Sequence, residues 1–277
     1  MRVFLLVVMC IIPISAVGGP MRPGNFFESE VRLRPVPTGL GFGAAYGRQS
    51  PFYESSNIAL SRNGIAYGAM LQFSPISAHP GVFVRVIPLT VLELEFGVQG
   101  LSYFGVLNSV LAYPSTDADW SQGGQKGRRE RKGVVPGLGY SAFGIGRLKL
   151  KVSGVVLVSE YELRHVRLIS PTTEVWYDAE RNQLMKASDV YQRSLSILGW
   201  MFGSSMDDSH ILAALSWSEW NSIANSNRHL AGLGLIRQIS NNNESTRWLF
   251  VLATYLQDAY QQNEIFGAFV WKKSLSL

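Results

Sequence analysis

The side chains that could do acid–base or metal chemistry are few, and they lie far apart in the sequence. The only cysteine is Cys10, and the four histidines are His79, His165, His210 and His229. No His-x-x-x-His or Cys-x-x-Cys spacing occurs, so the sequence contains no familiar metal-binding motif. We therefore expect no metal and no cofactor.

Two places bring a hydroxyl close to an imidazole. Ser209 directly precedes His210, and Ser226 lies shortly before His229. A catalytic serine needs a base within hydrogen-bond reach and a third group that orients the base. Proximity in sequence shows neither, and solvated residues at strand ends explain both places. We assign no catalytic residue.

A different chemistry, ion pairing between strands, is indicated by residues 85–100, RVIPLTVLELEFGVQG. After the proline, large apolar residues alternate with Glu93, Glu95 and Gln99. With residues 88–90 as a turn, Arg85 lies opposite Glu93 and shares the polar face with it. The pattern predicts strands with one apolar and one charged face.

The solvent decides which of these faces is buried. In a soluble β-sandwich the apolar face packs inward and the charged face meets water. In a transmembrane β-barrel the apolar face meets lipid and the charged face lines the lumen. The period of two fits both arrangements, so other features of the sequence must decide.

The N-terminus indicates export. Residues 3–17, VFLLVVMCIIPISAV, form an apolar run that follows Arg2. This run has the length of a signal-peptide core and is short for a spanning helix. We predict a signal peptide at residues 1–18, with an uncleaved anchor as the alternative. The exported chain would then contain no cysteine and no disulfide.

The rest of the chain reads as short strands. After residue 20 no run of 18 apolar residues occurs, so no helical span is expected. Segments of roughly ten residues with a period of two are typical of a transmembrane barrel. We count about twelve strands, with a range of about ten to fourteen. The segments are 39–48, 53–61, 65–74, 81–87, 90–104, 134–146, 148–165, 190–202, 210–220, 228–239, 246–257 and 264–273.

These segments predict an all-β fold, a closed antiparallel up-and-down transmembrane β-barrel at residues 39–277, preceded by a periplasmic segment at 19–38. Six polar residues are expected to line its lumen: Arg85, Glu93, Glu95, Gln99, Lys149 and Lys151. They could line a narrow channel, or they could form cross-strand pairs that fill the interior.

Two connections, 105–133 and 166–189, are long, and they fall on the same end of the predicted barrel. Short turns face the periplasm in such barrels, and long loops face outward. The first loop is strongly basic, through Lys126, Arg128, Arg129, Arg131 and Lys132. In an outer loop these residues would meet the phosphates of lipopolysaccharide. A flexible, solvated loop is the alternative.

Aromatic residues near segment ends, such as Tyr46, Trp200 and Trp248, also favour a membrane barrel, because aromatic rings gather at membrane interfaces. Their ordinary preference for strands is the alternative explanation. Together with the signal peptide and the loop lengths, these rings favour the barrel in lipid over an exported soluble sandwich.

The turn at Pro88, the run VLELEFGVQGLSYFG (91–105), the long polar loop and LKLKVSGVVLVSEYEL (148–163) resemble uncharacterised proteobacterial outer-membrane β-barrel proteins. The resemblance implies a barrel in the outer membrane of a Gram-negative bacterium and no known catalytic residues. One departure is the C-terminus, WKKSLSL, because outer-membrane barrels usually end in Phe or Trp.

For function we consider a narrow pore or transport channel first, and a structural or surface-interaction barrel second. A lipid hydrolase of the outer membrane is the third reading, and we expect no enzyme activity. The expected partners are outer-membrane lipid, lipopolysaccharide and the outer-membrane assembly machinery. The net charge of +5 is too small to indicate nucleic acid. Substrate, ion selectivity and oligomeric state are left open.

Overall fold

A computed structural model describes residues 21, 23–36, 38–55, 57, 60–106, 110–132, 134–171, 173–202, 208–240, 244–261 and 263–276. The predicted signal peptide at residues 1–18 lies outside the described residues. None of the helices in the described part of the chain is long and apolar enough to cross a membrane.

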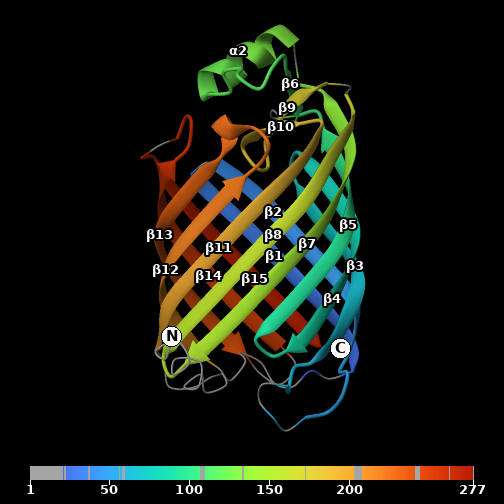
Figure 1. Cartoon of the computed structure of the whole chain (residues 1–277), viewed down its shortest axis with the longest axis vertical. Helices are drawn as coiled ribbons and strands as arrows, with labels where there is room; N and C mark the ends of the chain where they lie inside the picture. The colour runs from blue at the N-terminus through green and yellow to red at the C-terminus, as the bar shows by residue number, and fades with distance from the viewer. Residues whose placement is uncertain are drawn as a thin grey trace, which may run out of the picture.

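The main body is a closed antiparallel barrel of twelve strands, which confirms the predicted fold (Figure 1). Neighbours in sequence are neighbours in the wall, and β1 closes the barrel by pairing with β15. The wall strands are β1 (Gly24–Val36), β2 (Thr38–Ser50), β3 (Gly64–Ser74), β4 (Ser77–Leu89), β5 (Leu92–Phe104), β7 (Pro136–Val152), β8 (Val155–Ser170), β11 (Ser188–Phe202), β12 (Asp208–Trp220), β13 (Arg228–Ser240), β14 (Glu244–Gln257) and β15 (Ile265–Ser276).

The strand count was predicted correctly, but one strand was misplaced. Residues 24–36 form β1 of the wall, so the prediction of a periplasmic segment at 19–38 is wrong for them. The described residues of the predicted strand 53–61 are not in a strand. They belong to a connection organised by the buried side chain of Asn63, which accepts from the backbone of Phe52 and Tyr53 and donates to the carbonyl of Tyr53.

Two register predictions also need correction. The predicted boundary between segments 134–146 and 148–165 is misplaced: β7 continues through Arg147 to Val152, and the turn lies at Ser153 and Gly154. In the strand register Arg85 lies opposite Glu95 and not opposite Glu93, because β4 runs through the proline to Leu89. The Arg85 guanidinium still lies 3.5 Å from Glu93. The slip is two residues, so every side chain keeps its predicted face.

The apolar face of the strands points outward. On β4 and β5 the alternate residues Val82, Val84, Phe96 and Val98 are 55%, 41%, 55% and 54% exposed. Their neighbours on the other face, such as Glu95, are buried inside the barrel. This exposed apolar belt matches a wall that meets lipid.

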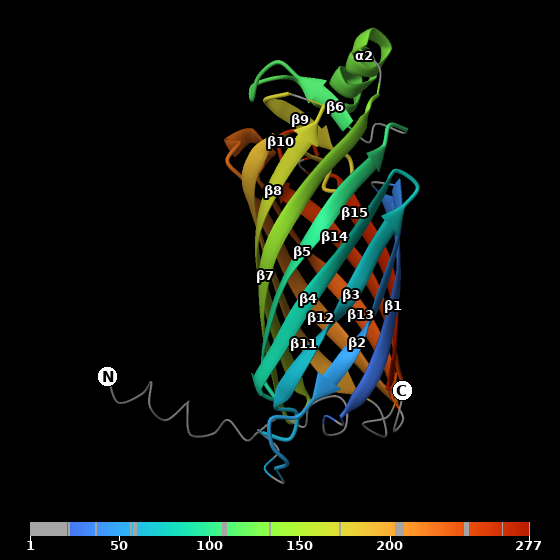
Figure 2. The same cartoon turned by 90° about the vertical axis from the view of Figure 1, so that its right-hand side faces the viewer.

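One end of the barrel carries a folded cap, defined as a three-stranded sheet, the helix α2 (Gln122–Lys132) and the short helix η1 (Ala224–Ser226). The sheet has the order β10-β9-β6, with β6 at Val110–Tyr113, β9 at Val175–Asp178 and β10 at Gln183–Lys186. Both long connections lie at this end, as their lengths predict (Figure 2). β1 begins and β15 ends at the opposite end.

Candidate functional site

The cap is packed into the mouth of the barrel by apolar side chains. Val110, Trp176 and Met185 of the cap are fully buried against Leu101 and Tyr103 of the wall, among others. A second cluster above it joins the cap strands to one another through Leu111, Trp120, Tyr177, Leu184 and Ile223. The cap sheet is therefore a folded element fixed to the wall.

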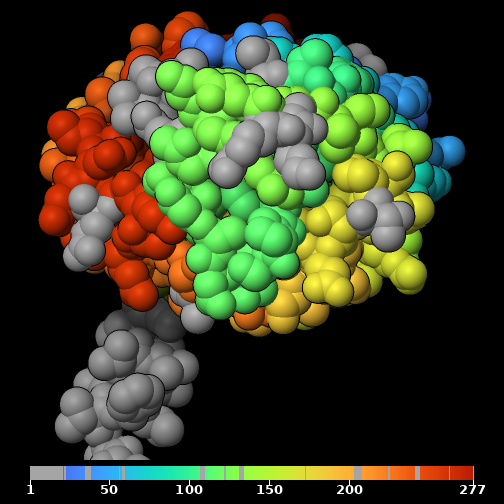
Figure 3. Space-filling view, turned by 90° about the horizontal axis from the view of Figure 1, so that it is seen from above, coloured from blue at the N-terminus to red at the C-terminus, as the bar shows by residue number. Residues whose placement is uncertain are grey.

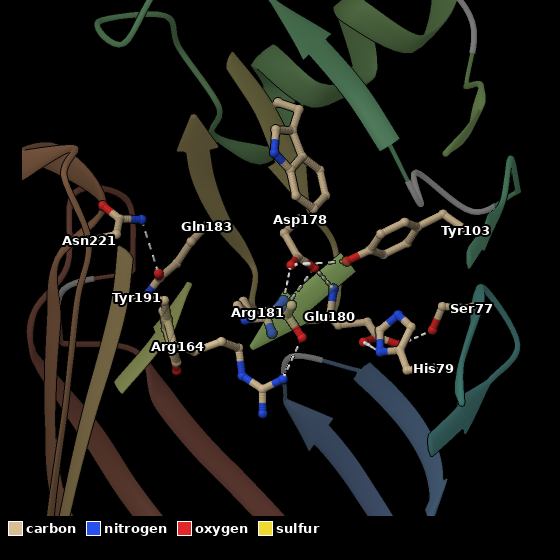
Figure 4. A network of polar contacts seen from close by, with 12 residues as sticks. Ser77, His79, Tyr103, Arg164, Asp178, Glu180, Arg181, Gln183, Tyr191 and Asn221 are labelled. Atoms are coloured by element: carbon tan, nitrogen blue, oxygen red, sulfur yellow. Dashed lines mark hydrogen bonds and ion pairs between the residues drawn. The ribbon is translucent and has the colours of Figure 1, made fainter. Parts of the chain in front are cut away.

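A polar network lies directly beneath this packing (Figure 4). Asp178, at the end of β9, pairs with Arg181 and accepts a 3.3 Å hydrogen bond from the Tyr103 hydroxyl. In the same turn, Glu180 accepts a 2.9 Å hydrogen bond from Ser74 and lies 3.4 Å from the buried ring of His79. Wall and cap are thus joined by charged groups as well.

The opposite wall holds the cap in the same way. Gln183 of β10 donates a 2.9 Å hydrogen bond to Glu219, which also accepts 2.5 Å from Tyr191. Arg228 donates to the backbone carbonyls of Arg181 and Asn182. Because buried polar groups are costly when unpaired, this network favours one docked position of the cap.

Below the cap, charges of alternating sign form a continuous row inside the barrel, which we call the ion ladder. It starts at Lys272, whose ammonium lies 3.0 Å from Glu28. Glu28 lies 3.1 Å from Arg85, and Arg85 lies 2.8 Å from Glu95. The contact between β1 and β4 passes over β2 and β3, where the residues opposite are the small Ala45 and Ala66.

The ladder continues around the wall. Arg147 lies 2.5 Å from Glu93 and 2.7 Å from Glu160, and Arg193 lies 2.6 Å from Glu160 and 2.9 Å from Glu162. The last member is Arg164, which lies 2.7 Å from Glu162 and donates 2.6 Å to Gln99. Each charge of the ion ladder is compensated by a neighbour, which matches a filled interior better than a selective channel.

The structure places five of the six predicted lumen residues in this row or in contact with it. Arg85, Glu93, Glu95 and Gln99 belong to it, and Lys149 pairs with Glu93 at 2.6 Å. Lys151 lies on the same face of β7, near the lower end of the strand.

Sequence reasoning missed the remaining members, Glu28, Arg147, Glu160, Glu162, Arg164, Arg193 and Lys272. These residues alternate with apolar residues, which is the pattern of a lumen face. The prediction did not use this pattern because it placed residues 19–38 outside the barrel and a strand boundary at residue 147.

The basic segment forms α2 at the top of the cap. Arg128 is engaged there, since it donates a 2.5 Å hydrogen bond to the carbonyl of Ala112 and lies over the ring of Tyr113. Lys126 and Arg129 are also part of the helix, and the side chains of Arg131 and Lys132 lie outside the described residues.

The predicted Ser–His neighbours do not form a catalytic pair in the structure. Ser226 is buried and donates to Asn221, which is a structural role. His229 instead shares a hydrogen bond with Ser218, across β12 and β13 on the outer surface. Among the described residues, that bond is the one recorded hydrogen bond of the His229 side chain.

Two tyrosines of the cap have raised pKa values because they are buried. Tyr113, on β6, is 5% exposed, and burial raises its pKa to about 12. Burial likewise raises the pKa of Tyr177 on β9 well above its usual range. Seen from above, the described residues of the two long connections cover most of the mouth (Figure 3).

Comparison with known proteins supports this architecture. No protein-family model matches the sequence, and no curated protein matches it. The chain is similar to the beta domain of the Bordetella autotransporter BrkA, with 12% identity, 92% of this chain and 99% of that chain covered, and a TM-score of 0.54. This is the fold of outer-membrane β-barrel proteins.

Weaker likenesses extend to an LpxR from Salmonella typhimurium, at 9% identity, 91% and 100% coverage and a TM-score of 0.45. The NanC porin has 10% identity, 91% and 100% coverage and a TM-score of 0.44. At these identities the likeness concerns the fold, and the activity has to be argued from the site.

Proposed function

We propose that this chain is an outer-membrane barrel that acts at the cell surface through its cap and has no open pore. Of the two readings favoured from sequence, this is the surface-interaction barrel rather than the channel. The observation that carries it is the docked cap, buried against the wall by Trp176 and Met185 and bonded to it through Asp178 and Glu180.

The orientation follows from the connections. The turns at the end opposite the cap are mostly short, as at Thr90–Val91 and Ser153–Gly154. Since short turns face the periplasm in outer-membrane barrels, the cap faces outward. The basic helix α2 then lies on the outer side of the membrane, where lipopolysaccharide presents phosphates, and Lys126 and Arg129 are its proposed contacts.

Conductance in planar bilayers tests the closed lumen. The intact chain is expected to give no stable current steps at any voltage. A variant in which residues 107–133 and 172–186 are replaced by short Gly-Ser linkers should show frequent current fluctuations, because the cap no longer fills the mouth. Heat-modifiable gel migration is the control that both proteins have folded into barrels. Steady conductance by the intact chain would reject the proposal in favour of the pore.

Binding to lipopolysaccharide tests the partner. The double variant Lys126→Gln, Arg129→Gln should bind immobilised lipopolysaccharide several-fold more weakly at low salt, and high salt should remove the difference. The matched control is Arg237→Gln, which removes a charge from the exposed barrel surface next to Asp208. Equal binding by all three proteins would exclude this contact.

We propose no catalytic activity. A hydrolase reading has one supporting contact, the hydrogen bond between Ser218 and His229 on the outer surface near the cap end. No group that orients His229 is recorded among the described residues, although a catalytic serine needs one. Phospholipase activity that disappears in Ser218→Ala would establish the enzyme instead.

A further inference from the structure

The outward face of the wall is not apolar everywhere. On β11 the outward residues between Val190 and Leu198 are all polar, namely Gln192, Ser194 and Ser196. Val190 and Leu198 are 44% and 57% exposed, so apolar residues lie above and below these three side chains along the strand. The polar residues therefore lie within the belt that meets hydrocarbon, where β4 and β5 present valine and phenylalanine.

The neighbouring strands continue this polar surface, because their outward residues at the same positions of the register are polar too. We define the polar patch by its members on three strands: Ser159 and Tyr161 on β8, Gln192, Ser194 and Ser196 on β11, and Ser216 and Ser218 on β12. Tyr161 donates a 2.8 Å hydrogen bond to Gln192, and Ser218 shares one with His229. No hydrogen bond is recorded for the other four hydroxyls among the described residues.

Hydroxyl groups without a partner are costly in hydrocarbon. An acyl chain offers them neither a donor nor an acceptor, and an apolar side chain suits a wall that faces lipid better. The surface of another protein can supply both kinds of partner. The polar patch therefore indicates a contact with protein inside the membrane.

The chemistry of the patch suits a second copy of this chain. A serine hydroxyl both donates and accepts, so a surface of serines can bind a copy of itself. All members of the patch are uncharged, so two copies do not repel each other there. A closed dimer has a two-fold axis, and its interface is the same patch on both copies. In a membrane that axis follows the membrane normal, because both copies are inserted in the same direction.

The tilt of the strands decides which residues would meet across such an axis. The row of cross-strand partners that contains Ser159, Ser196 and Ser216 reaches Ile265 at the cap end of β15, so each row rises from β8 toward β15. With strands ~4.8 Å apart and tilted by ~40°, one strand spacing raises a row by ~3 Å, and two residues along a strand change the depth by ~5 Å. Ser194 and Ser216 therefore lie within ~2 Å of the same depth.

We propose that the polar patch binds a second copy of this chain around a two-fold axis between β11 and β12. Ser194 then faces Ser216 of the second copy, and Gln192 faces Ser218 of the second copy. Every one of these contacts occurs twice, once on each side of the axis. The contact does not depend on what the cap binds.

The apolar residues around the patch fit the same arrangement. Below it, Leu198 faces Leu212 of the second copy, and these side chains are 57% and 54% exposed. On β8, Leu163 is 47% exposed and lies at nearly the same depth as Ala231 on β13 of the second copy. Ala231 lines a depression of about 290 Å³ in the outer surface. A large protruding side chain thus meets a hollow.

Sedimentation equilibrium in density-matched micelles of pentaethylene glycol octyl ether tests the association. The intact chain should sediment with twice the mass of one chain. The double variant Ser194→Val, Ser216→Val should weaken the dimer at least tenfold. The double variant Ser194→Thr, Ser216→Thr is the matched control and should still form the dimer, because threonine has the shape of valine but keeps the hydroxyl. Heat-modifiable gel migration is the control for folding.

Cross-linking in the outer membrane of cells tests the position of the contact. Ser194→Cys should give a cross-linked dimer with a short, membrane-permeant bis-methanethiosulfonate reagent. Val84→Cys, on the outward face of β4, is the matched control and should give none. Cys10 is common to both variants, so it cannot cause a difference between them.

Four results would overturn the proposal. The mass of a single chain at every concentration would exclude the second copy. A dimer that is unchanged in the valine variant would place the contact elsewhere on the wall. Loss of the dimer in both double variants would exclude recognition through the hydroxyls. Cross-linking of Ser194→Cys exclusively to a different protein would assign the patch to that protein.

Discussion

Arg147 is the residue on which the ion ladder depends most. Its guanidinium lies within 3.3 Å of Glu95, 2.5 Å of Glu93 and 2.7 Å of Glu160, and its side chain is 19% exposed. An Arg147→Met variant removes one cation from each of these carboxylates and leaves Arg85 beside Glu93 and Glu95, and Arg193 beside Glu160. Breaking a buried pair of this kind costs about 3 kcal/mol or more. The urea midpoint of unfolding in lipid vesicles measures the loss.

Arg237→Met is the matched control for that experiment. Arg237 pairs with Asp208 at 3.1 Å, but both side chains are about half exposed, 48% and 46%. Exposed pairs of this kind contribute little to stability. Equal midpoints for the two variants would mean that the lumen is wet enough to screen its charges.

Sequence reasoning found part of this row because Arg85, Glu93 and Glu95 stand in strands with clear alternation. It predicted the wrong register neighbour for Arg85, since it ended β4 before the proline, yet it kept the correct face. The pairing of Glu28 with Arg85 could not be predicted, because it bridges strands that are not adjacent in the wall.

At the scale of the element, β1 explains why one wall strand was missed. Glu28, Glu30, Arg32 and Arg34 alternate along it, so it reads as a charged segment outside the barrel. In a barrel wall these charged residues face the lumen, and the lipid-facing side of the strand is supplied by apolar residues such as Val31 and Leu33. The cap was beyond prediction for another reason. Its strands have four residues each and are stabilised by packing on the wall.

Gly47 on β2 and Gly68 on β3 let these two strands approach each other closely. A Cβ atom on Gly47 would lie 2.2 Å from the carbonyl oxygen of Tyr67, a backbone atom that cannot move aside. We expect Gly47→Ala to destabilise the barrel by about 1–3 kcal/mol, the range for overpacking. Gly41→Ala, on the same face of β2 with nothing within 4 Å, should be neutral or slightly stabilising. Similar unfolding midpoints for both variants would contradict this difference.

The cap should open at high pH before the barrel unfolds. Burial raises the pKa of Tyr113 to about 12, so the folded cap disfavours the phenolate. Its contribution to stability is complete below the unfolded pKa of about 10 and is lost as pH rises through the folded value. Emission from the buried Trp120, taken as the difference from a Trp120→Phe variant, measures the opening. Tyr113→Phe should move the transition to higher pH, and an unchanged transition would assign it to another group.

The whole molecule has two chemically different ends, and labelling of cells distinguishes them. A cysteine at Lys126 in α2 should react with an impermeant maleimide on intact cells. A cysteine at Asn57, in the connection at the opposite end, should react only after the outer membrane is opened. The opposite result would reverse the proposed orientation, and with it the contact of α2 with lipopolysaccharide.

The joint between β1 and β15 sets a condition on how the protein is made. Glu28 and Lys272, which meet across that joint, are 244 residues apart. Until the final strand emerges, β1 keeps an unpaired edge and one charge of the row lacks its partner, so the nascent wall is an open sheet that can pair with other chains. Because so distant a contact forms last and slowly, shielding of the first strand during synthesis limits the yield of finished protein.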